Sequence, residues 1–230
     1  MIKAILMDFN GVIINDEPIQ LQVYRELLAP EGVEMTDADY HASLGMDDVT
    51  FVRAAYERKG KPVDDAKVKE LTGNAFEKWK EVIAKEMPLF EGIENVIEKF
   101  AREFTLGIVS MSRRRDIQHV LKATNLEQFF SIIVSADDVS KCKPDPECYR
   151  LGFRRLDSFR TAAGHLPMTH NDCLVIEDSP PGIVGARSAD LPALGVANTV
   201  SPDELRAAGA GAVAKDLRDW FPESIRQVFV

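Results

Sequence analysis

The feature that most constrains the fold is a regular alternation, over residues 92–196, between short apolar segments and longer amphipathic ones. The short segments have the length of strands, and the longer ones show the period of about 3.6 residues that is typical of helices. Such alternation favours a parallel sheet with right-handed crossovers, and therefore an α/β, Rossmann-like, doubly wound fold. Residues 2–9 are a further apolar run of strand length, which we assign to the same sheet. The other expected strands are residues 106–110, 132–134, 173–176 and 193–196, and the helices between them lie at 93–100, around 117–121, after Pro146 and at 181–189.

Between the first strand and this alternating part, the sequence has a helical pattern and no convincing strand. Residues 36–39 have the pattern of a capping box, which marks the start of a helix. We therefore divide the chain into a Rossmann-like core domain of residues 1–14 and 89–230 and an all-helical cap domain of residues 15–88, inserted after the first strand. The longer helices of the cap are expected at residues 47–59 and 64–85.

The composition limits the partners of the protein. The 230 residues carry a formal net charge of -9, which disfavours nucleic acid or a membrane surface as the main partner, because both attract clustered Lys and Arg. No apolar segment reaches the length of a transmembrane helix.

The cysteines Cys142, Cys148 and Cys173 lack the paired spacing of a zinc site, and we expect reduced thiols in a cytoplasmic protein. No terminal or heptad pattern indicates a partner surface, so we expect a monomer.

Polar residues stand at the carboxyl ends of the predicted strands. Asp8, Ser110 and the pair Glu177 and Asp178 each end or follow a strand, and Lys143 lies in the loop after another. Because open α/β sheets bind ligands at the carboxyl ends of their strands, these five side chains are expected to converge. Taken singly, each is more often a turn, capping or solvated residue. Their joint position at one edge of the sheet instead favours a shared phosphate and metal site.

Four short motifs in this order resemble those of the haloacid dehalogenase superfamily, in its branch of phosphatases and β-phosphoglucomutase-like enzymes with a helical cap. The first motif of that family usually has the form Asp-x-Asp-Gly-Thr or Asp-x-Asp-Gly-Val. The segment Asn15-Asp16-Glu17-Pro18 is also similar to the start of the cap in that branch, which is commonly Asp-Ser-Glu-Pro. The four motifs here are Asp8-Phe9-Asn10-Gly11-Val12, Ser110-Met111-Ser112, Lys143-Pro144-Asp145-Pro146 and Ile176-Glu177-Asp178-Ser179.

The resemblance implies a Mg²⁺-dependent phosphatase that acts on a small phosphorylated metabolite through a phosphorylated Asp8, with Lys143 as a cation beside the phosphate. Physical chemistry supports these roles, because a phosphate ester repels an attacking carboxylate unless cations neutralise its oxygens. Mg²⁺ also prefers oxygen ligands. The residues expected to bind Mg²⁺ are Asp8, Asn10 through its backbone carbonyl, Glu177 and Asp178, and those expected to bind the substrate are Ser110, Met111, Ser112, Arg113 and Lys143. Arg113 begins a run of three arginines, a pattern that is also typical of a solvated helix face.

Asn10 departs from the first motif, which usually has a second Asp at this position. In the family's phosphatases that Asp protonates the leaving group and later activates water, and an amide can do neither. General acid–base assistance contributes about 10²- to 10⁴-fold to the rate. We therefore expect slow turnover, with phosphorylation of Asp8 by activated donors and slow hydrolysis of the product.

The residue at position 10 leaves other interpretations open. Dehalogenases have Tyr and phosphonatases Ala there, but the intact acidic pair of the fourth motif disfavours the first and the absence of a cap lysine at residues 41–47 disfavours the second. A mutase of this branch has a cap Arg that holds the distal phosphate, whereas the corresponding residues 45–48 include Asp47 and Asp48 instead, and Gln20 replaces a mutase His. Mutase activity is therefore disfavoured, and we expect a substrate with one phosphate and a neutral or cationic remainder. A catalytically impaired protein that binds a phosphorylated ligand or a regulatory partner is the alternative function, and a residue introduced to trap a ligand would also explain Asn10.

Overall fold

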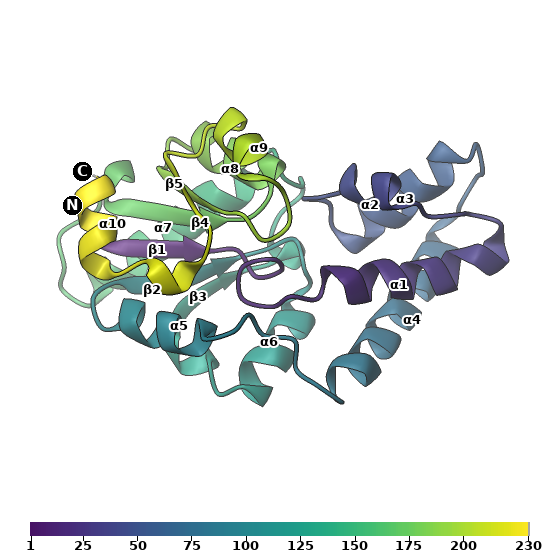
Figure 1. Cartoon of the computed structure of the whole chain (residues 1–230), viewed down its shortest axis with the longest axis horizontal. Helices are drawn as coiled ribbons and strands as arrows, with labels where there is room; N and C mark the ends of the chain where they lie inside the picture. The colour runs from purple at the N-terminus through teal and green to yellow at the C-terminus, as the bar shows by residue number, and fades with distance from the viewer. Residues whose placement is uncertain (230) are drawn as a thin grey trace.

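Residues 1–229, which the computed structural model describes, form a six-stranded sheet with a group of helices at one end of it (Figure 1). The strands are β1 (Ala4–Met7), β2 (Thr105–Val109), β3 (Phe130–Val134), β4 (Cys173–Glu177), β5 (Ala193–Val196) and β6 (Ala212–Ala214). Their order is β3-β2-β1-β4-β5-β6, and every neighbouring pair is parallel. The strand order changes direction between β1 and β4, which is the place where sheets of this type bind ligands.

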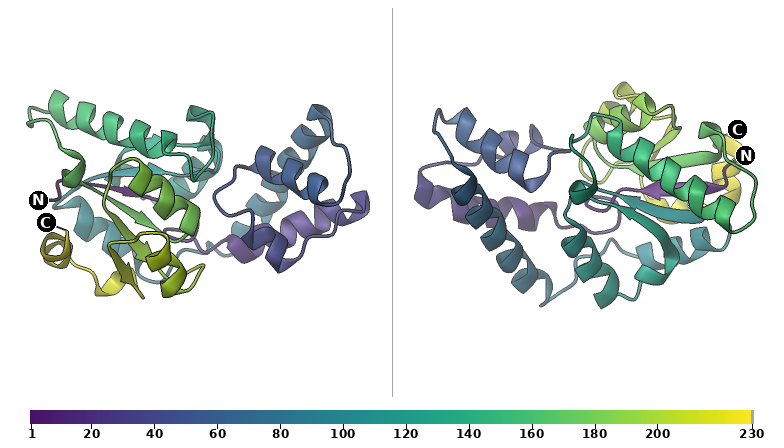
Figure 2. Two further views of the ribbon diagram at one scale, coloured as in Figure 1. Left: turned by 90° about the horizontal axis from the view of Figure 1, so that it is seen from above. Right: turned by 180° about the vertical axis from the view of Figure 1, so that it is seen from behind.

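Apolar side chains alternate between the two faces of the sheet and pack against helices on both sides. Along β1, Ile5 and Met7 belong to the buried cluster on one face and Ala4 and Leu6 to the cluster on the other. The two-residue period of a strand dictates this alternation, and it produces three layers (Figure 2). The first face is covered by α5 (Ile93–Ala101), α6 (Arg114–Ala123) and α10 (Pro222–Val228), and the second by α7 (Glu147–Ala162), α8 (Pro180–Ser188) and α9 (Pro202–Ala207).

The helices between β1 and α5 form a separate group, which Figures 1 and 2 show to one side of the sheet. Their apolar side chains, Val52 and Leu71 among them, form a buried cluster of their own. Thr36 makes the expected capping box, since its hydroxyl accepts a hydrogen bond from the Asp39 amide and the Asp39 carboxylate accepts one from the Thr36 amide. The helices of this group are α1 (Glu17–Leu28), α2 (Asp37–His41), α3 (Asp48–Arg58) and α4 (Asp65–Ile83).

The chain leaves the sheet and returns to it along two segments that lie side by side. The amide of Asn15 donates a hydrogen bond of 2.6 Å to the carbonyl of Pro88, and Ile14 forms an antiparallel bridge with Leu89. Trp79, near the end of α4, packs into the same buried cluster as β1. The helical group is therefore joined to the sheet next to the carboxyl end of β1.

The α/β doubly wound fold with a helical insertion is the one that the sequence predicts, but β6 is not among the predicted strands. With three residues at the edge of the sheet, β6 is too short to show an apolar alternation. The helices α9 and α10, of six and seven residues, are short enough to escape a periodicity argument for the same reason. Short 3₁₀ turns occur at Ala29–Glu31, Glu127–Phe129, Ala136–Asp138, His170–Asp172 and Leu217–Asp219.

Two sequence expectations touch the limits of this description. Residue 230, the last of the predicted core domain, lies outside the described residues. Within residues 1–229, each helix is too short or too polar to span a bilayer.

Replacement of Leu6 by Ala tests the packing of the central strand. Leu6 is fully buried in β1, so the variant should lose about 2–5 kcal/mol of the free energy of unfolding, the usual effect of truncating a core leucine. The measurement is a urea titration followed by circular dichroism. The matched control is Leu166→Ala, because Leu166 is 82% exposed and should change the midpoint very little. Equal losses in the two variants would contradict this packing.

Candidate active site

The carboxyl ends of β1, β2 and β4 and the loop between β3 and α7 meet at the edge of the sheet that faces the helical group (Figure 1). Asp8, Ser110, Lys143 and Asp178 line a cavity at this edge, whose volume is ≈ 1000 Å³ when its open mouth is included. Glu177 is fully buried at the end of β4, next to the cavity wall. The five side chains selected from the strand ends therefore lie together, although they come from segments far apart in the sequence.

Lys143 connects two of the buried carboxylates. Its Nζ atom lies 2.9 Å from Oδ2 of Asp8 and 2.5 Å from Oε1 of Glu177, and all three side chains are buried. Oε1 of Glu177 also accepts a hydrogen bond of 2.9 Å from the Tyr149 hydroxyl. Its Oε2 accepts hydrogen bonds from the amide and the hydroxyl of Ser179, at 2.8 and 2.9 Å. Both oxygens of Glu177 are thus occupied by protein donors.

Asp178 approaches the cluster from the other side. Its Oδ2 accepts a short hydrogen bond from the Thr199 hydroxyl. Gly11 has a φ angle of +73°, and a Cβ atom added to it would lie 1.8 Å from Oδ2 of Asp178. The turn after β1 therefore passes directly over this carboxylate, and only glycine leaves room for it there.

Burial and mutual repulsion set the protonation of the carboxyl groups. Burial, together with the charge of Glu177, raises the pKa of Asp8 to about 8 against the opposing effect of the Lys143 ammonium. Burial and the charges of Glu177 and Asp8 also raise the pKa of Asp178 well above its ordinary value. Burial acts on Glu177 as well, but the charge and hydrogen bond of Lys143 outweigh it and hold the pKa of Glu177 below its ordinary value.

The charge of this cluster fits a divalent cation. Asp8, Glu177 and Asp178 offer oxygens that all lie within 4.8 Å of one another. When all three carboxyl groups are ionised, the one ammonium leaves two negative charges without compensation in a buried place, which is unfavourable unless a cation is bound. Asp8 and Asp178 line the cavity, so they are the better placed of the three to hold a metal ion, because the oxygens of Glu177 already accept four hydrogen bonds.

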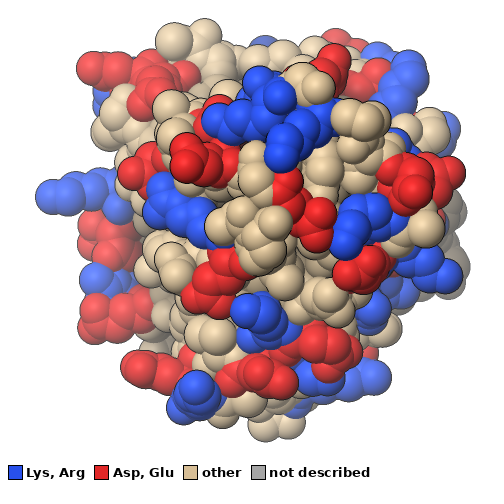
Figure 3. Space-filling view, turned by 90° about the vertical axis from the view of Figure 1, so that its right-hand side faces the viewer, with Lys and Arg blue, Asp and Glu red and all other residues tan. Residues whose placement is uncertain are grey.

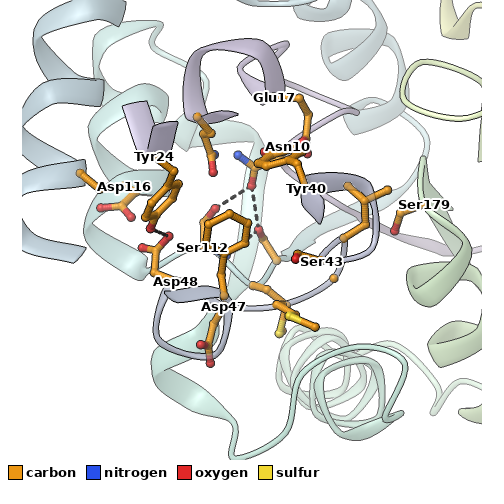
Figure 4. A pocket seen from close by; sticks show the side chains of 18 of the residues that line it. Asn10, Glu17, Tyr24, Tyr40, Ser43, Asp47, Asp48, Ser112, Asp116 and Ser179 are labelled. Atoms are coloured by element: carbon orange, nitrogen blue, oxygen red, sulfur yellow. Dashed lines mark hydrogen bonds between the residues drawn. The ribbon is translucent and has the colours of Figure 1, made fainter. Parts of the chain in front are cut away.

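Both ends of the Asn10 side-chain amide are hydrogen-bonded, and Figure 4 draws the hydrogen bonds of its oxygen end. Its Nδ2 donates to the two carboxylate oxygens of Asp16, at 2.9 and 3.1 Å. Its Oδ1 accepts from the hydroxyl of Ser112 at 2.6 Å and from that of Ser110 at 3.4 Å. The amide thus acts as a donor to one element and as an acceptor from another.

Asp16 is the partner that distinguishes an amide from a carboxylate at position 10. Asp16 is fully buried and accepts further hydrogen bonds from Gln20 Nε2 at 2.9 Å and from Trp79 Nε1 at 2.8 Å. Burial raises the pKa of Asp16, while the donors, Gln20 first and then Asn10, oppose that shift. An aspartate at position 10 would place a second carboxylate within hydrogen-bonding distance of the buried Asp16, and like charges at that distance repel strongly.

The helical group contributes the opposite wall of the cavity, through residues of α1, α2, α3 and α4 and the loop at residues 43–47. Gly45 in this loop has a φ angle of +82°, and an added Cβ atom would lie 2.9 Å from Pro181 and 3.1 Å from Lys143. The amide of Asp47 donates a hydrogen bond of 3.4 Å to the sulfur of Cys142. The loop therefore touches the sheet domain beside Lys143, and the helical group shapes the space next to the buried cluster.

The residues after β2 have different surroundings. Met111 and Ser112 line the cavity, as does Ser110. The guanidinium of Arg113 instead donates a hydrogen bond of 2.9 Å to the Thr72 hydroxyl and lies 3.9 Å from the carboxylate of Asp48. We therefore assign Arg113 to a contact between α6 and the helical group, rather than to the phosphate site where the sequence placed it.

Several residues of this site do not stand out in the sequence. Thr199 follows β5, so the rule that selected the other strand ends also points to this hydroxyl. Tyr149 lies in the first turn of α7 and Asp16 just before α1, and neither has a signal of its own, because their roles depend on which side chains the fold brings next to them.

Comparisons with known proteins agree with this geometry. A sequence model of the family described as haloacid dehalogenase-like hydrolase matches residues 5–196. A phosphorylated carbohydrates phosphatase of Thermotoga maritima is 26% identical over 235 residues, which cover 98% of this chain and 97% of that protein. A validoxylamine A 7'-phosphate phosphatase of Streptomyces hygroscopicus subsp. limoneus is 25% identical over 228 residues, 95% of this chain and 96% of that one. The crystal structure of a β-phosphoglucomutase from Clostridium difficile superposes with a TM-score of 0.86 at 19% identity, covers 100% of this chain and 97% of its own, and shows the same fold.

The contact between Asn10 and Asp16 gives a testable expectation about stability. The Asn10→Asp variant removes a donor from a buried carboxylate and adds a like charge, so it should lose about 1–3 kcal/mol of the free energy of unfolding. The double variant Asn10→Asp/Asp16→Asn restores one amide and one carboxylate with their positions exchanged, and should recover most of that loss. Urea titrations of the parent chain, both single variants and the double variant measure the coupling energy. Additive effects, with no recovery in the double variant, would contradict the contact.

Proposed function

We propose that this chain, which belongs to the haloacid dehalogenase-like hydrolase family, is a Mg²⁺-dependent phosphatase of small phosphorylated metabolites. The observation that carries the proposal is the buried ammonium of Lys143 between Asp8 and Glu177, with Asp178 beside them, at the ligand-binding edge of the sheet. The relatives named for phosphorylated carbohydrates and for validoxylamine A 7'-phosphate support a carbohydrate-like phosphate monoester as the substrate.

In this proposal the metal ion is held by Asp8, Asp178 and the backbone carbonyl of Asn10. Glu177 belongs to the same carboxylate group, and its main contribution is to hold Lys143, since protein donors occupy its oxygens. A bound Mg²⁺ would supply positive charge to the phosphoryl oxygens, which lowers the repulsion that an attacking carboxylate meets.

Asp8 is the nucleophile. One of its carboxylate oxygens forms a bond to phosphorus while the bond from phosphorus to the leaving oxygen breaks, which gives a phosphorylated Asp8. Lys143 lies 2.9 Å from Asp8, so its charge stabilises the ionised carboxylate and is close enough to bind a phosphoryl oxygen. The hydroxyl of Ser110, at the same edge of the cavity, donates a hydrogen bond to another of these oxygens.

Asn10 sets the rate of the steps that need a proton. Its amide has no proton to give to an alkoxide leaving group and does not accept one from water. An acyl phosphate leaves as a carboxylate, which needs no proton, so such donors phosphorylate Asp8 readily. Hydrolysis of the phosphorylated Asp8 needs an activated water and is therefore slow.

The helical group is the cap in this proposal, with residues 15–88 as its extent. It contacts the sheet domain beside Lys143 through the loop that contains Gly45, and it closes the cavity on the side of the leaving group. Closure excludes water and strengthens the electrostatic interactions at the phosphate.

Phosphorylation of Asp8 can be observed directly by intact-protein mass spectrometry. After mixing with Mg²⁺ and acetyl phosphate, the chain should gain the mass of one phosphoryl group, and the adduct should persist. The Asp8→Ala variant should gain none. In the double variant Asn10→Asp/Asp16→Asn, which supplies a carboxylate at position 10 without the repulsion from Asp16, the adduct should decay faster. Absence of an adduct in both the chain and the double variant, or an adduct that survives Asp8→Ala, would overturn the proposed nucleophile.

Mg²⁺ should raise the melting temperature, and more so at high pH than at low pH. Burial raises the pKa of Asp8 from 3.8 to about 8, so the folded state holds the Asp8 proton more tightly than the unfolded state. The stabilisation from protonated Asp8 is therefore fully present below about pH 4 and is lost as the pH rises through 8. The cation relieves this loss by compensating the ionised carboxylates. Thermal melts with Mg²⁺ or with a chelator at pH 5 and pH 8.5 measure the difference, and Asp178→Asn should reduce it. An equal effect of Mg²⁺ at the two pH values would contradict binding at this cluster.

A further inference from the structure

The cavity lining carries more acidic than basic side chains, both at the phosphate site and on the side away from it. Its described lining includes Lys143 as the one basic side chain, against six acidic ones. The surface of the helical end is different, because Figure 3 shows Lys and Arg side chains interspersed with Asp and Glu there. The excess is thus a property of the cavity. The acidic residues are Asp8, Glu17, Asp47, Asp48, Asp116 and Asp178.

Most of the carboxylates on the cap side of the cavity have protein donors. Asp47 accepts a hydrogen bond of 2.7 Å from the amide of Thr50, and Asp48 accepts one of 2.6 Å from the hydroxyl of Tyr24. Hydrogen bonds of this kind account for acidic side chains without any ligand. These two residues therefore do not by themselves indicate what the cavity binds.

Glu17 is different. Its Oε2 atom is buried and has no hydrogen-bond partner anywhere in residues 1–229. Figure 4 places the Glu17 side chain at the edge of the cavity, beside Asn10 and Tyr40. A buried carboxylate oxygen without a donor is costly, so a ligand that brings a donor to this place gains more than the same ligand would gain at the surface.

The surroundings of Glu17 favour a donor that carries positive charge. Burial, and the charges of Asp16 and Glu177, raise the pKa of Glu17 to about 7, against the hydrogen bond of the Tyr40 hydroxyl. Each of these influences is relieved by a cation next to the carboxylate. The Lys143 ammonium does not serve this purpose, because it lies between Asp8 and Glu177.

We propose that Glu17 binds the ammonium group of the substrate, so that the enzyme prefers phosphate monoesters that carry a primary amine close to the phosphate. The inference rests on the proposed phosphate site. Glu17 and Asp178 of the metal site line the same cavity, so one small substrate can reach both when its amine lies only a few bonds from its phosphate. Short aminoalkyl phosphates and 2-amino sugar 1-phosphates have this arrangement.

Matched pairs of substrates test the preference. Phosphoethanolamine differs from 2-hydroxyethyl phosphate, and glucosamine 1-phosphate from glucose 1-phosphate, by an ammonium group in place of a hydroxyl. In each pair, kcat/KM with Mg²⁺ should favour the amine by about tenfold or more, the usual worth of a charge-assisted hydrogen bond to a buried group. The ratio within a pair is the readout, because a general change in activity cancels from it.

Glu17→Gln is the decisive variant and Glu26→Gln the matched control. Glu17→Gln keeps the shape of the side chain but removes its charge, so the ratio should fall to near one. Glu26 lies on the same helix, pairs with Lys78 at the surface and lies outside the cavity lining, so Glu26→Gln should keep the parent ratio. A parent ratio near one, or an equal ratio in Glu17→Gln, would overturn the inference.

Failure of the phosphatase proposal is distinguishable from failure of this inference. If acetyl phosphate does not phosphorylate Asp8 and none of the four esters is hydrolysed, the proposed reaction is wrong. The dissociation constants of the same four compounds, measured by isothermal titration calorimetry with Mg²⁺, then give the ratios instead. Tighter binding of the amines that is lost in Glu17→Gln supports the ammonium site, and equal binding within both pairs overturns it.

Discussion

The site depends on one buried ammonium group. Lys143 lies between Asp8 and Glu177 and thereby joins the end of β1, the loop after β3 and the end of β4. Moving charged groups out of water is costly, and the attraction within the cluster offsets that cost only when each group keeps its partners. Tyr149 and Ser179 complete the set around Glu177. The geometry of the sheet edge and the electrostatics of the cavity are therefore not independent, since the same contacts fix both.

The sequence predicts those parts of the structure in which a pattern is local or repeated. The strands around Asp8, Ser110 and Asp178 are apolar runs that end at polar residues, and the rule for parallel sheets brings such ends together. The capping box at Thr36 needs only four residues. β6 and the last two helices are too short for this kind of argument, because periodicity needs several turns or pleats to be visible. Partnerships between side chains are harder still. Arg113 reaches Thr72 across the chain, and no property of its neighbours in sequence indicates that direction.

Asn10 shows how a departure from a motif changes its meaning when the surroundings are known. By sequence it is the loss of a carboxylate. In the structure its amide donates to Asp16 and accepts from Ser112, two tasks that a carboxylate cannot perform together without an extra proton. The local network is thus consistent with an amide at position 10. Agreement between a residue and its partners is the criterion by which a sequence specifies a structure.

The adjacent crossings between the sheet and the helical group have a consequence for how such proteins diversify. Asn15 and Pro88 are hydrogen-bonded to each other, so the ends of the insertion are held together whatever lies between them. One contiguous stretch of chain can lengthen, shorten or be exchanged without moving the strand end that carries Asp8 or the loop that carries Lys143. Selectivity for the molecule and competence for the chemistry can therefore evolve separately, each in its own part of a single polypeptide.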